Sequence, residues 1–414
     1  MAEEFFVHQF DNGLVLLGDR LGHVVSTAVN IALPAGSSRD GQKLAGAGTV
    51  LTDWLFRGAG DRDSRQLNDA LDSLGCHHDE HIQSSFLQLT ASQIHQELRQ
   101  VLGIYADILL RPRLEAKTFG PCRELALQDL LSLEEEPTRK CNMRLRERFY
   151  PAPLGVSAMG TEQSLTALTS RSLRSHALKH INPHGAIMTV AGRFEWEEVL
   201  GWVTELLGAW KGKPLKPITL GPVVGGVGVE EKPTSQMQIS LAYPAPMAGD
   251  PHYYPMRVAE MVLSGGMSGR LFTEVREKRG LVYHVGARYQ GVKQAAGIFV
   301  YAGTAPARAQ QTLEVTVAEL RRLAEGVSPE ELARSKTQLK SALIMQGEST
   351  AARAGGLVAD WHLLGRLRSL EEIAAAIDAV TQEDILACLA AYPARNITAY
   401  ILGPEKLDTT CLQS

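Results

Sequence analysis

With 414 residues, the chain is long enough for two domains of about 200 residues each. It is 44% hydrophobic and 21% charged, with a formal net charge of −4, which argues against nucleic-acid binding and against an anionic-membrane surface. The start, MAEEFFVHQFDNG, is acidic and lacks a long apolar run, so we expect neither a secretory signal nor a transmembrane helix. Five scattered cysteines indicate reduced thiols and a cytoplasmic protein rather than a disulfide framework or a Cys-based zinc site.

The first half opens with alternating apolar residues at 24–37, which predict a strand that ends in a Pro-Ala-Gly turn. Helices are predicted at about 46–56 and from Ser64 to a C-terminal cap at Gly75. A further helix is predicted in HQELRQVLGIYADILLRP, and a long one from about 115 to 135, ending before Pro137. The segment LTSRSLRSHALKHINPHGAIMTVAG then predicts a helix followed by a strand.

The second half repeats this order. SQMQISLAYPAPM corresponds to the first strand, SPEELARSKTQLKSALIM to the long helix, and VTQEDILACLAAYPARNITAYILGP to the last helix and strand. The expected fold class is therefore α+β, with two homologous domains, each a mainly antiparallel sheet packed against helices. We place the domains at 1–212 and 233–414, joined by a Pro- and Gly-rich linker at 213–232.

One stretch, SLGCHHDEHIQSS, contains His77, Glu80 and His81 in the His-x-x-Glu-His spelling of an inverted zinc-peptidase motif. It directly follows the helix stop at Gly75 and runs into alternating residues typical of a strand. In a strand, His77, Asp79 and His81 face one side and Glu80 the other, and the two histidines lie about 13 Å apart. That spacing does not suit two ligands of one zinc ion.

The order of elements, together with the block LSGGMSGRLFTEVREKRGLVYHVGA, resembles the pitrilysin/insulinase clan of zinc peptidases. The resemblance runs from FDNGLVLL to ITAYILGP and is strongest to the branch of roughly 400-residue subunits that includes the mitochondrial processing peptidase. It implies two α+β domains in each chain and two chains that close around an extended peptide.

In that family, the helix after the first strand carries two histidines that bind zinc and the catalytic glutamate. The matching block here is GAGTVLTDWLFRGAG, which has Thr49, Thr52 and Asp53 at those positions. The family's third ligand, a Glu on the long helix, matches Asp129, with Glu124 as the alternative register. Hydroxyl groups are weak zinc ligands, and this set contains no base to deprotonate a bound water, so we expect no metal in this chain.

The resemblance also implies a role for Arg279 and Tyr283, in the stretch RGLVY. In the family, this pair reaches the partner's zinc site and binds the peptide carbonyl oxygen, where preorganised donors stabilise developing charge. The alternative is structural: Arg279 caps a helix and Tyr283 packs on the sheet. Gly265 and Gly266, in SGGMSG, are either a substrate-handling loop or a plain turn.

These features predict a non-catalytic, substrate-binding subunit of a heterodimeric zinc metallopeptidase. A homologous partner would hold the zinc, and extended peptides would be the substrates, with Asp79, Glu80 and His81 lining the peptide cleft. Two alternatives remain open. The chain is a structural subunit without proteolysis, like the core subunits of respiratory complexes, or it is a self-sufficient metallopeptidase that uses His77, Glu80 and His81.

Overall fold

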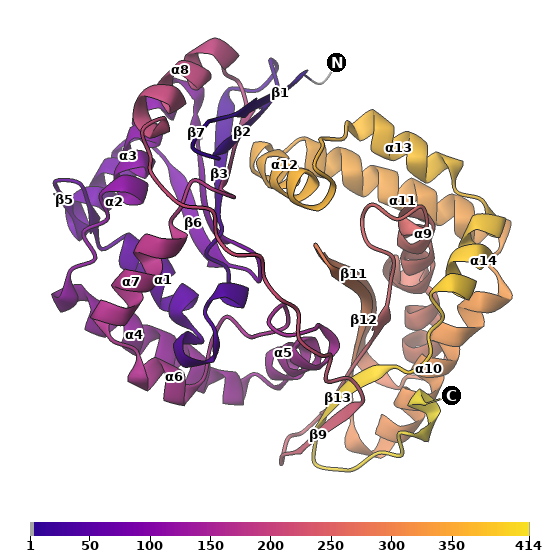
Figure 1. Cartoon of the computed structure of the whole chain (residues 1–414). Coiled ribbons are helices and arrows are strands. Elements are labelled where there is room, and N and C mark those ends of the chain that lie inside the picture. The colour runs from indigo at the N-terminus through magenta and orange to yellow at the C-terminus, as the bar shows by residue number, and fades with distance from the viewer. Residues whose placement is uncertain (1–3, 414) are drawn as a thin grey trace. The chain divides into compact units, whose positions relative to one another are not determined.

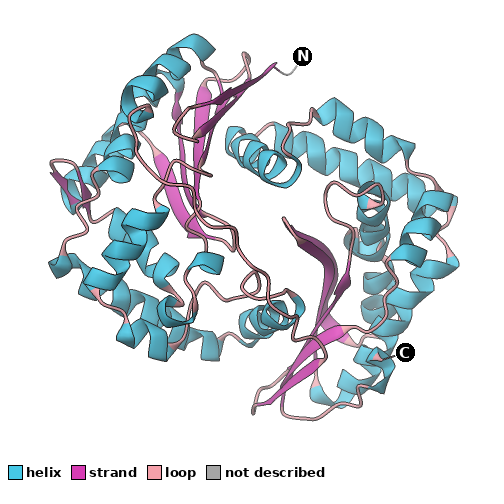
Figure 2. Cartoon of the chain, in the orientation of Figure 1, coloured by secondary structure: helices cyan, strands magenta, loops and turns pink. Residues whose placement is uncertain are grey.

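The computed structural model describes residues 4–413, which divide into two compact units, each discontinuous in sequence (Figure 1). The first contains the chain up to Ser132, then Val156–Leu220 and Gln346–Leu367; the second contains Leu133–Gly155, Gly221–Met345 and the chain from Arg368 onward. In both units, helices gather against a sheet (Figure 2). None of the helices within residues 4–413 has the length and apolar character needed to cross a membrane.

The first unit contains a six-stranded sheet in the order β1-β2-β8-β3-β7-β6. Its strands are β1 (Glu4–Gln9), β2 (Val15–Arg20), β3 (Ser26–Leu33), β6 (His77–Ile82), β7 (Leu87–Ile94) and β8 (Ile187–Gly192). Only the β2–β8 pair in this sheet is parallel, and β6 forms one edge of the sheet. A separate two-stranded hairpin joins β4 (Gly58–Ala59) to β5 (Arg62–Asp63).

One large core holds the helices of the first half against this sheet, with Trp54 and Tyr105 among its fully buried side chains. The helices are α1 (Ala47–Leu55), α2 (Ser64–Ser73), α3 (Leu98–Leu110), α4 (Ala116–Ser132), α6 (Glu162–Ala167), α7 (Ser170–His180) and α8 (Trp196–Leu207). Another helix, α12 (Thr350–Leu364), packs on β3 and β8 through a separate cluster of small residues: Ala28, Ala191 and Ala354.

The second unit contains a five-stranded sheet in the order β11-β12-β10-β13-β9. Its strands are β9 (Val227–Glu231), β10 (Met237–Pro244), β11 (Val282–Val292), β12 (Ala295–Thr304) and β13 (Thr398–Gly403), and β9 pairs in parallel with β13. Its helices are α5 (Pro137–Phe149), α9 (Tyr253–Ser264), α10 (Ala309–Arg322), α11 (Pro329–Gly347), α13 (Leu370–Ala379) and α14 (Gln382–Ala391), with a π-helical turn at Phe272–Glu277.

The predicted duplication and fold class are confirmed. If β9, β13, β10, β12 and β11 are matched to β2, β8, β3, β7 and β6, the two sheets have the same strand order and the same single parallel pair. The local signals repeat too: Thr169 starts α7 and Thr381 starts α14, each with a capping box. The first sheet has one additional strand, β1.

Compared with the expected boundaries 1–212 and 233–414, each unit additionally includes a helix from the other half of the sequence. Helix α5 packs on β10 and β13, and α12 packs on β3 and β8. Both sheets therefore have a helix from the other half against them. Hydrophobic periodicity does not reveal this exchange, because it indicates that a helix buries one face but not which sheet covers that face.

The expected linker, 213–232, also differs from the structure, because residues 227–231 form β9 at the edge of the second sheet. This strand is only partly buried, so its sequence lacks a sustained apolar pattern. The residues between Lys211 and Gly226 are irregular, as the Pro and Gly content predicts.

Candidate functional site

On α1, the positions that match the family's zinc helix have hydrogen bonds of their own. The Thr49 hydroxyl donates to the carbonyl oxygen of Ala158 (2.6 Å), and the Thr52 hydroxyl donates to the carbonyl oxygen of Thr49 (2.7 Å). Both carboxylate oxygens of Asp53 accept from Arg57, at 2.7 and 2.9 Å. These three side chains therefore contact the backbone and a guanidinium group rather than converging on one point.

Helix α4, which packs against α1, contains the two candidates for the position of the family's third zinc ligand, Asp129 and Glu124. The buried thiol of Cys122 lies on the α1-facing side of α4, where burial first and then the neighbouring Asp53 carboxylate raise its pKa to about 12. Asp129 lies seven residues further on and shares this face, whereas Glu124 is exposed on another. Helix geometry therefore favours Asp129 over Glu124 as the counterpart of the family's third ligand.

This donor set does not fit a catalytic zinc site. It offers two hydroxyl groups, a carboxylate bound by Arg57 and one further carboxylate, where zinc prefers imidazole, thiolate and carboxylate ligands. Within residues 4–413, no group of three or more His, Cys, Asp and Glu side chains is arranged to hold a metal ion. No chemical step of this chain is therefore assigned to a metal at this position.

The His77–His81 stretch is the edge strand β6, as the sequence predicts, and its side chains alternate between the two faces. On one face, His78 Nδ1 lies 2.6 Å from a Glu80 carboxylate oxygen, and the His78 ring stacks on Phe56. On the other face, His81 Nδ1 lies 3.4 Å from Asp79. The residues of the His-x-x-Glu-His motif are thus divided between the two faces of a strand.

The Glu80 carboxylate acts electrostatically on the neighbouring His78. Its hydrogen bond raises the pKa of His78, against the opposing effect of partial burial. Glu80 therefore interacts with a histidine outside the motif. His77, Asp79 and, in part, His81 remain accessible along the strand.

In the second unit, Arg279 and Tyr283 flank the start of β11, which forms an edge of the sheet. Tyr283 is 66% exposed, so the structural alternative of a tyrosine packed on the sheet does not apply. Arg279 does contact the preceding helical turn: one guanidinium nitrogen donates to the Glu274 carbonyl oxygen (2.7 Å) and to its carboxylate (2.8 Å). Its side chain nevertheless remains 39% exposed.

Sequence reasoning missed Glu274, which orients Arg279. Hydrogen bonds from Lys278 first, and then from Arg279, lower the pKa of Glu274 to about 2, so this carboxylate stays ionised and retains both cations. The sequence did contain a signal for these ion pairs: in TEVREKR, Glu274 precedes Lys278 by four residues and Arg279 by five. The same kind of spacing, Asp53 to Arg57, could have revealed the ion pair at the C-terminal end of α1.

The glycine-rich stretch forms the turn after α9. At Gly265, a Cβ atom would lie 2.4 Å from the Met261 carbonyl oxygen and 2.5 Å from a Gln338 side-chain oxygen, so a residue without a side chain is required. Gly266 has a positive φ of 80° and opens to free space. Gln338 also donates to the Gly265 carbonyl oxygen at 2.8 Å, which fixes the turn against α11.

Two family models match most of the chain. The model described as "Insulinase (Peptidase family M16)" matches residues 18–162, and the model described as "Peptidase M16 inactive domain" matches residues 167–339. Proteins named uncharacterized zinc proteases are similar over nearly the whole chain. The one from Rickettsia felis is 25% identical over 98% of this chain and 99% of its own length, and one from Streptomyces coelicolor is 27% identical over 95% and 88%.

Solved structures share the fold. A peptidase M16 inactive domain from Pseudomonas fluorescens superposes with a TM-score of 0.89 at 18% identity, covering 98% of this chain and 99% of that one. A chain of complex III2 from Candida albicans gives 0.85 at 18% identity, covering 96% of each. The duplicated α+β fold and both family models define an insulinase-type chain. The protein belongs to the insulinase family of peptidases, peptidase family M16.

Proposed function

We propose that this chain is the non-catalytic, substrate-binding subunit of a heterodimeric zinc metallopeptidase that cleaves extended peptides. The observation that carries the proposal is the contrast between its two halves. The positions matching the family's zinc helix hold Thr49, Thr52 and Asp53, each bonded elsewhere, while the Arg279 and Tyr283 pair is retained and accessible. A homologous subunit with an intact His-x-x-Glu-His helix would supply the zinc.

Arg279 and Tyr283 would act as donors to the partner's site. A guanidinium and a phenol both donate to an oxygen that gains negative charge, and their effect is greatest when they are held in place before the reaction. Glu274 supports this role for Arg279, because it holds part of the guanidinium group and leaves other N–H groups available.

The peptide would bind along β6. This strand hydrogen-bonds only to β7 among the described strands, so its outer edge offers backbone N–H and C=O groups to an added strand. The exposed Asp79 and the partly exposed Glu80 and His81 would contact the peptide side chains. Binding through backbone groups gives affinity with little sequence preference. Gly265 and Gly266 are proposed as a second contact, with the open side of Gly266 facing substrate.

A structural role without proteolysis is the second candidate, and the similarity to a chain of complex III2 from Candida albicans supports it. The third candidate, a self-sufficient peptidase using His77, Glu80 and His81, is disfavoured, because strand geometry puts Glu80 on the opposite face from both histidines.

The test is reconstitution with a zinc-bearing homologue encoded in the same genome. Hydrolysis of a quenched fluorescent peptide of extended conformation would be measured for each chain alone and for the mixture. We expect turnover by the mixture that exceeds the sum of the two chains, and none after Glu→Gln substitution of the homologue's catalytic base. A mixture no more active than the homologue alone would overturn the proposal and favour the structural candidate.

A further inference from the structure

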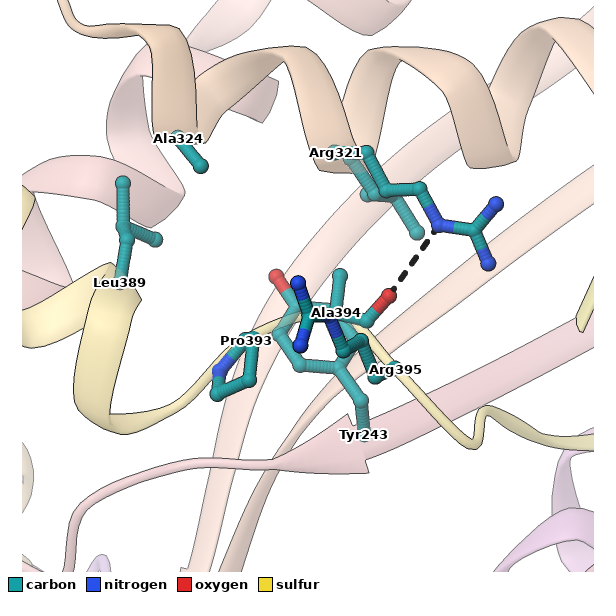
Figure 3. Close-up of a pocket in the computed structure, with 8 residues that line it drawn as sticks. Tyr243, Arg321, Ala324, Leu389, Pro393, Ala394 and Arg395 are labelled. Atoms are coloured by element: carbon teal, nitrogen blue, oxygen red, sulfur yellow. Dashed lines mark hydrogen bonds between the residues drawn. The ribbon is translucent and has the colours of Figure 1, made fainter. Parts of the chain in front are cut away.

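The second unit contains a pocket of about 320 Å³, and none of its lining residues belongs to β11 or to the glycine turn (Figure 3). Its walls come from the end of α10 and the turn after it, from α14, and from the loop that connects α14 to β13. Leu320, Ala324, Leu389 and Pro393 provide apolar surface. Pockets that hold small ligands have this composition, apolar walls with a few polar groups, although this one is at the small end of their range.

The loop wall of the pocket is held in place before any ligand arrives. Arg321 donates from Nε to the carbonyl oxygen of Ala394 (3.4 Å), the bond drawn in Figure 3, and from a terminal nitrogen to the carbonyl oxygen of Cys411 (2.6 Å). Pro393 prevents α14 from continuing, since a proline cannot extend the helix. The cavity is therefore built by specific contacts rather than left by a loose loop.

The hydroxyl group of Tyr243 is a polar group in the pocket wall. This residue projects from β10 toward the loop of residues 393–395 and is only 1% exposed (Figure 3). Its backbone is paired with Ile298, but no hydrogen bond to its hydroxyl group is found within the described part of the chain. Buried tyrosine hydroxyls normally have a partner, so this one leaves a donor for a bound molecule.

The charged groups that line the pocket are all positive. Arg395 lies on the loop, is exposed, and forms no ion pair with any carboxylate among residues 4–413. With Arg321, it gives the lining two guanidinium groups and no acidic side chain. Such a site attracts an anion, and a guanidinium group matches the two oxygens of a carboxylate.

From these observations, we propose that this pocket binds a small amphipathic carboxylate. Its apolar body would contact Leu320, Leu389 and Pro393, and its carboxylate would accept hydrogen bonds from the Tyr243 hydroxyl and the Arg395 guanidinium. The volume limits the ligand to a medium-chain fatty acid or an aromatic acid of similar size. This site does not depend on the proposed peptidase role, and the two can fail separately.

The test uses the full chain and two probes, octanoate and its neutral analogue octanamide, with binding followed by calorimetry and by the ¹³C signal of carboxyl-labelled octanoate. We expect saturable binding of octanoate, with octanamide at least about tenfold weaker. Tyr243→Phe and Arg395→Gln should each weaken octanoate binding by about tenfold or more, the usual effect of losing one hydrogen bond to a charged group. Arg171→Gln, an exposed arginine in α7, is the matched control and should bind octanoate normally.

Tyr243→Phe removes only an oxygen atom, so the variant should fold, and its melting temperature verifies this. Three results would each overturn the proposal: no saturable octanoate binding at millimolar concentration, equal binding of octanamide, or unchanged affinity in both Tyr243→Phe and Arg395→Gln.

Discussion

The guanidinium group of Arg353, in α12, forms an ion pair with the carboxylate of Asp19, in β2, and the two side chains are only 6% and 2% exposed. These residues are separated by 334 positions in the sequence. The pair therefore fixes a helix from the second half of the chain on the sheet of the first unit. The Thr189 hydroxyl adds a bond to the Ala354 carbonyl oxygen (2.9 Å) next to it.

The other unit contains the matching pair. Lys140, in α5, is 2.6 Å from Glu230, in β9. The two cations occupy the same helix position, since Lys140 is the fourth residue of α5 and Arg353 the fourth of α12. The two carboxylates also occupy the same strand position. In β9, Glu230 lies one residue before the partner of Gly403, the last residue of β13, and in β2, Asp19 lies one residue before the partner of Gly192, the last residue of β8. The exchanged helices are thus held by a cation and a carboxylate at equivalent positions of the duplicated fold.

Removal of one charge from the more buried pair should loosen α12. We expect Asp19→Asn to destabilise the packing of this helix by about 3 kcal/mol, because a buried guanidinium group loses its ionic partner. Hydrogen exchange should show faster exchange of α12 amides and unchanged exchange in α5, which serves as a control within the same molecule.

The double variant Asp19→Leu with Arg353→Met should recover most of the lost protection, since apolar residues can replace a buried ion pair. The corresponding change Glu230→Gln should have a smaller effect on α5, because the Glu230 side chain is 25% exposed and Lys140 also binds Glu134. Unchanged exchange in α12 of Asp19→Asn would refute the anchoring role of the pair.

The stability of the first unit should fall as the pH drops from 6.5 to about 4. Burial first, and then the neighbouring His176, lower the pKa of His180 from 6.5 to about 4. Between these values the unfolded chain binds a proton at this site and the folded chain does not, so protons favour unfolding. The buried Asp40 carboxylate lies 3.1 Å from His176 in the same cluster.

Melting temperatures measured across this pH range should therefore fall more steeply for the natural chain than for His180→Gln. His23→Gln, at an exposed histidine, is the control and should follow the natural chain. Parallel curves for all three proteins would show that His180 does not titrate as described.

The chain alone should hold far less than one zinc ion after dialysis against a mild chelator. The reason is chemical: the helix positions offer hydroxyl groups and a carboxylate paired with Arg57, and β6 divides its motif between two faces. Elemental analysis of the natural chain and of His77→Ala should give the same low value. About one zinc per chain, lost on His77→Ala or His81→Ala, would instead make the self-sufficient peptidase the leading candidate.

In a reconstituted pair, Arg279→Ala and Tyr283→Phe should each lower kcat by about a hundredfold, the usual effect of removing one preorganised donor to a developing negative charge. KM should change much less, and the melting temperature should not change, because both side chains are accessible. Arg288→Gln, at another exposed position of β11, should leave kcat unaltered. Equal kcat for all four proteins would mean that the pair has no role in turnover.

The sequence by itself determined the elements and their duplication. The helix starts at Thr169 and Thr381, the stop at Gly75 and the alternation of β6 are all encoded by residues within a few positions of one another. Caps and periodicity depend on such short-range contacts, and for this reason they can be recognised without a structure. The expectation that Thr49, Thr52 and Asp53 stand at the family's zinc positions likewise rests on a local block.

Only the tertiary structure decided which sheet each helix covers. The exchange of α5 and α12, the strand β9 within the expected linker and the donor left at Tyr243 all depend on contacts between residues far apart in the chain. The sequence of an amphipathic helix indicates that one of its faces is buried, and the sequence of a half-exposed strand indicates little more than an extended backbone. The partner of each face is selected by packing and by buried ion pairs such as Asp19 with Arg353, which no local pattern specifies.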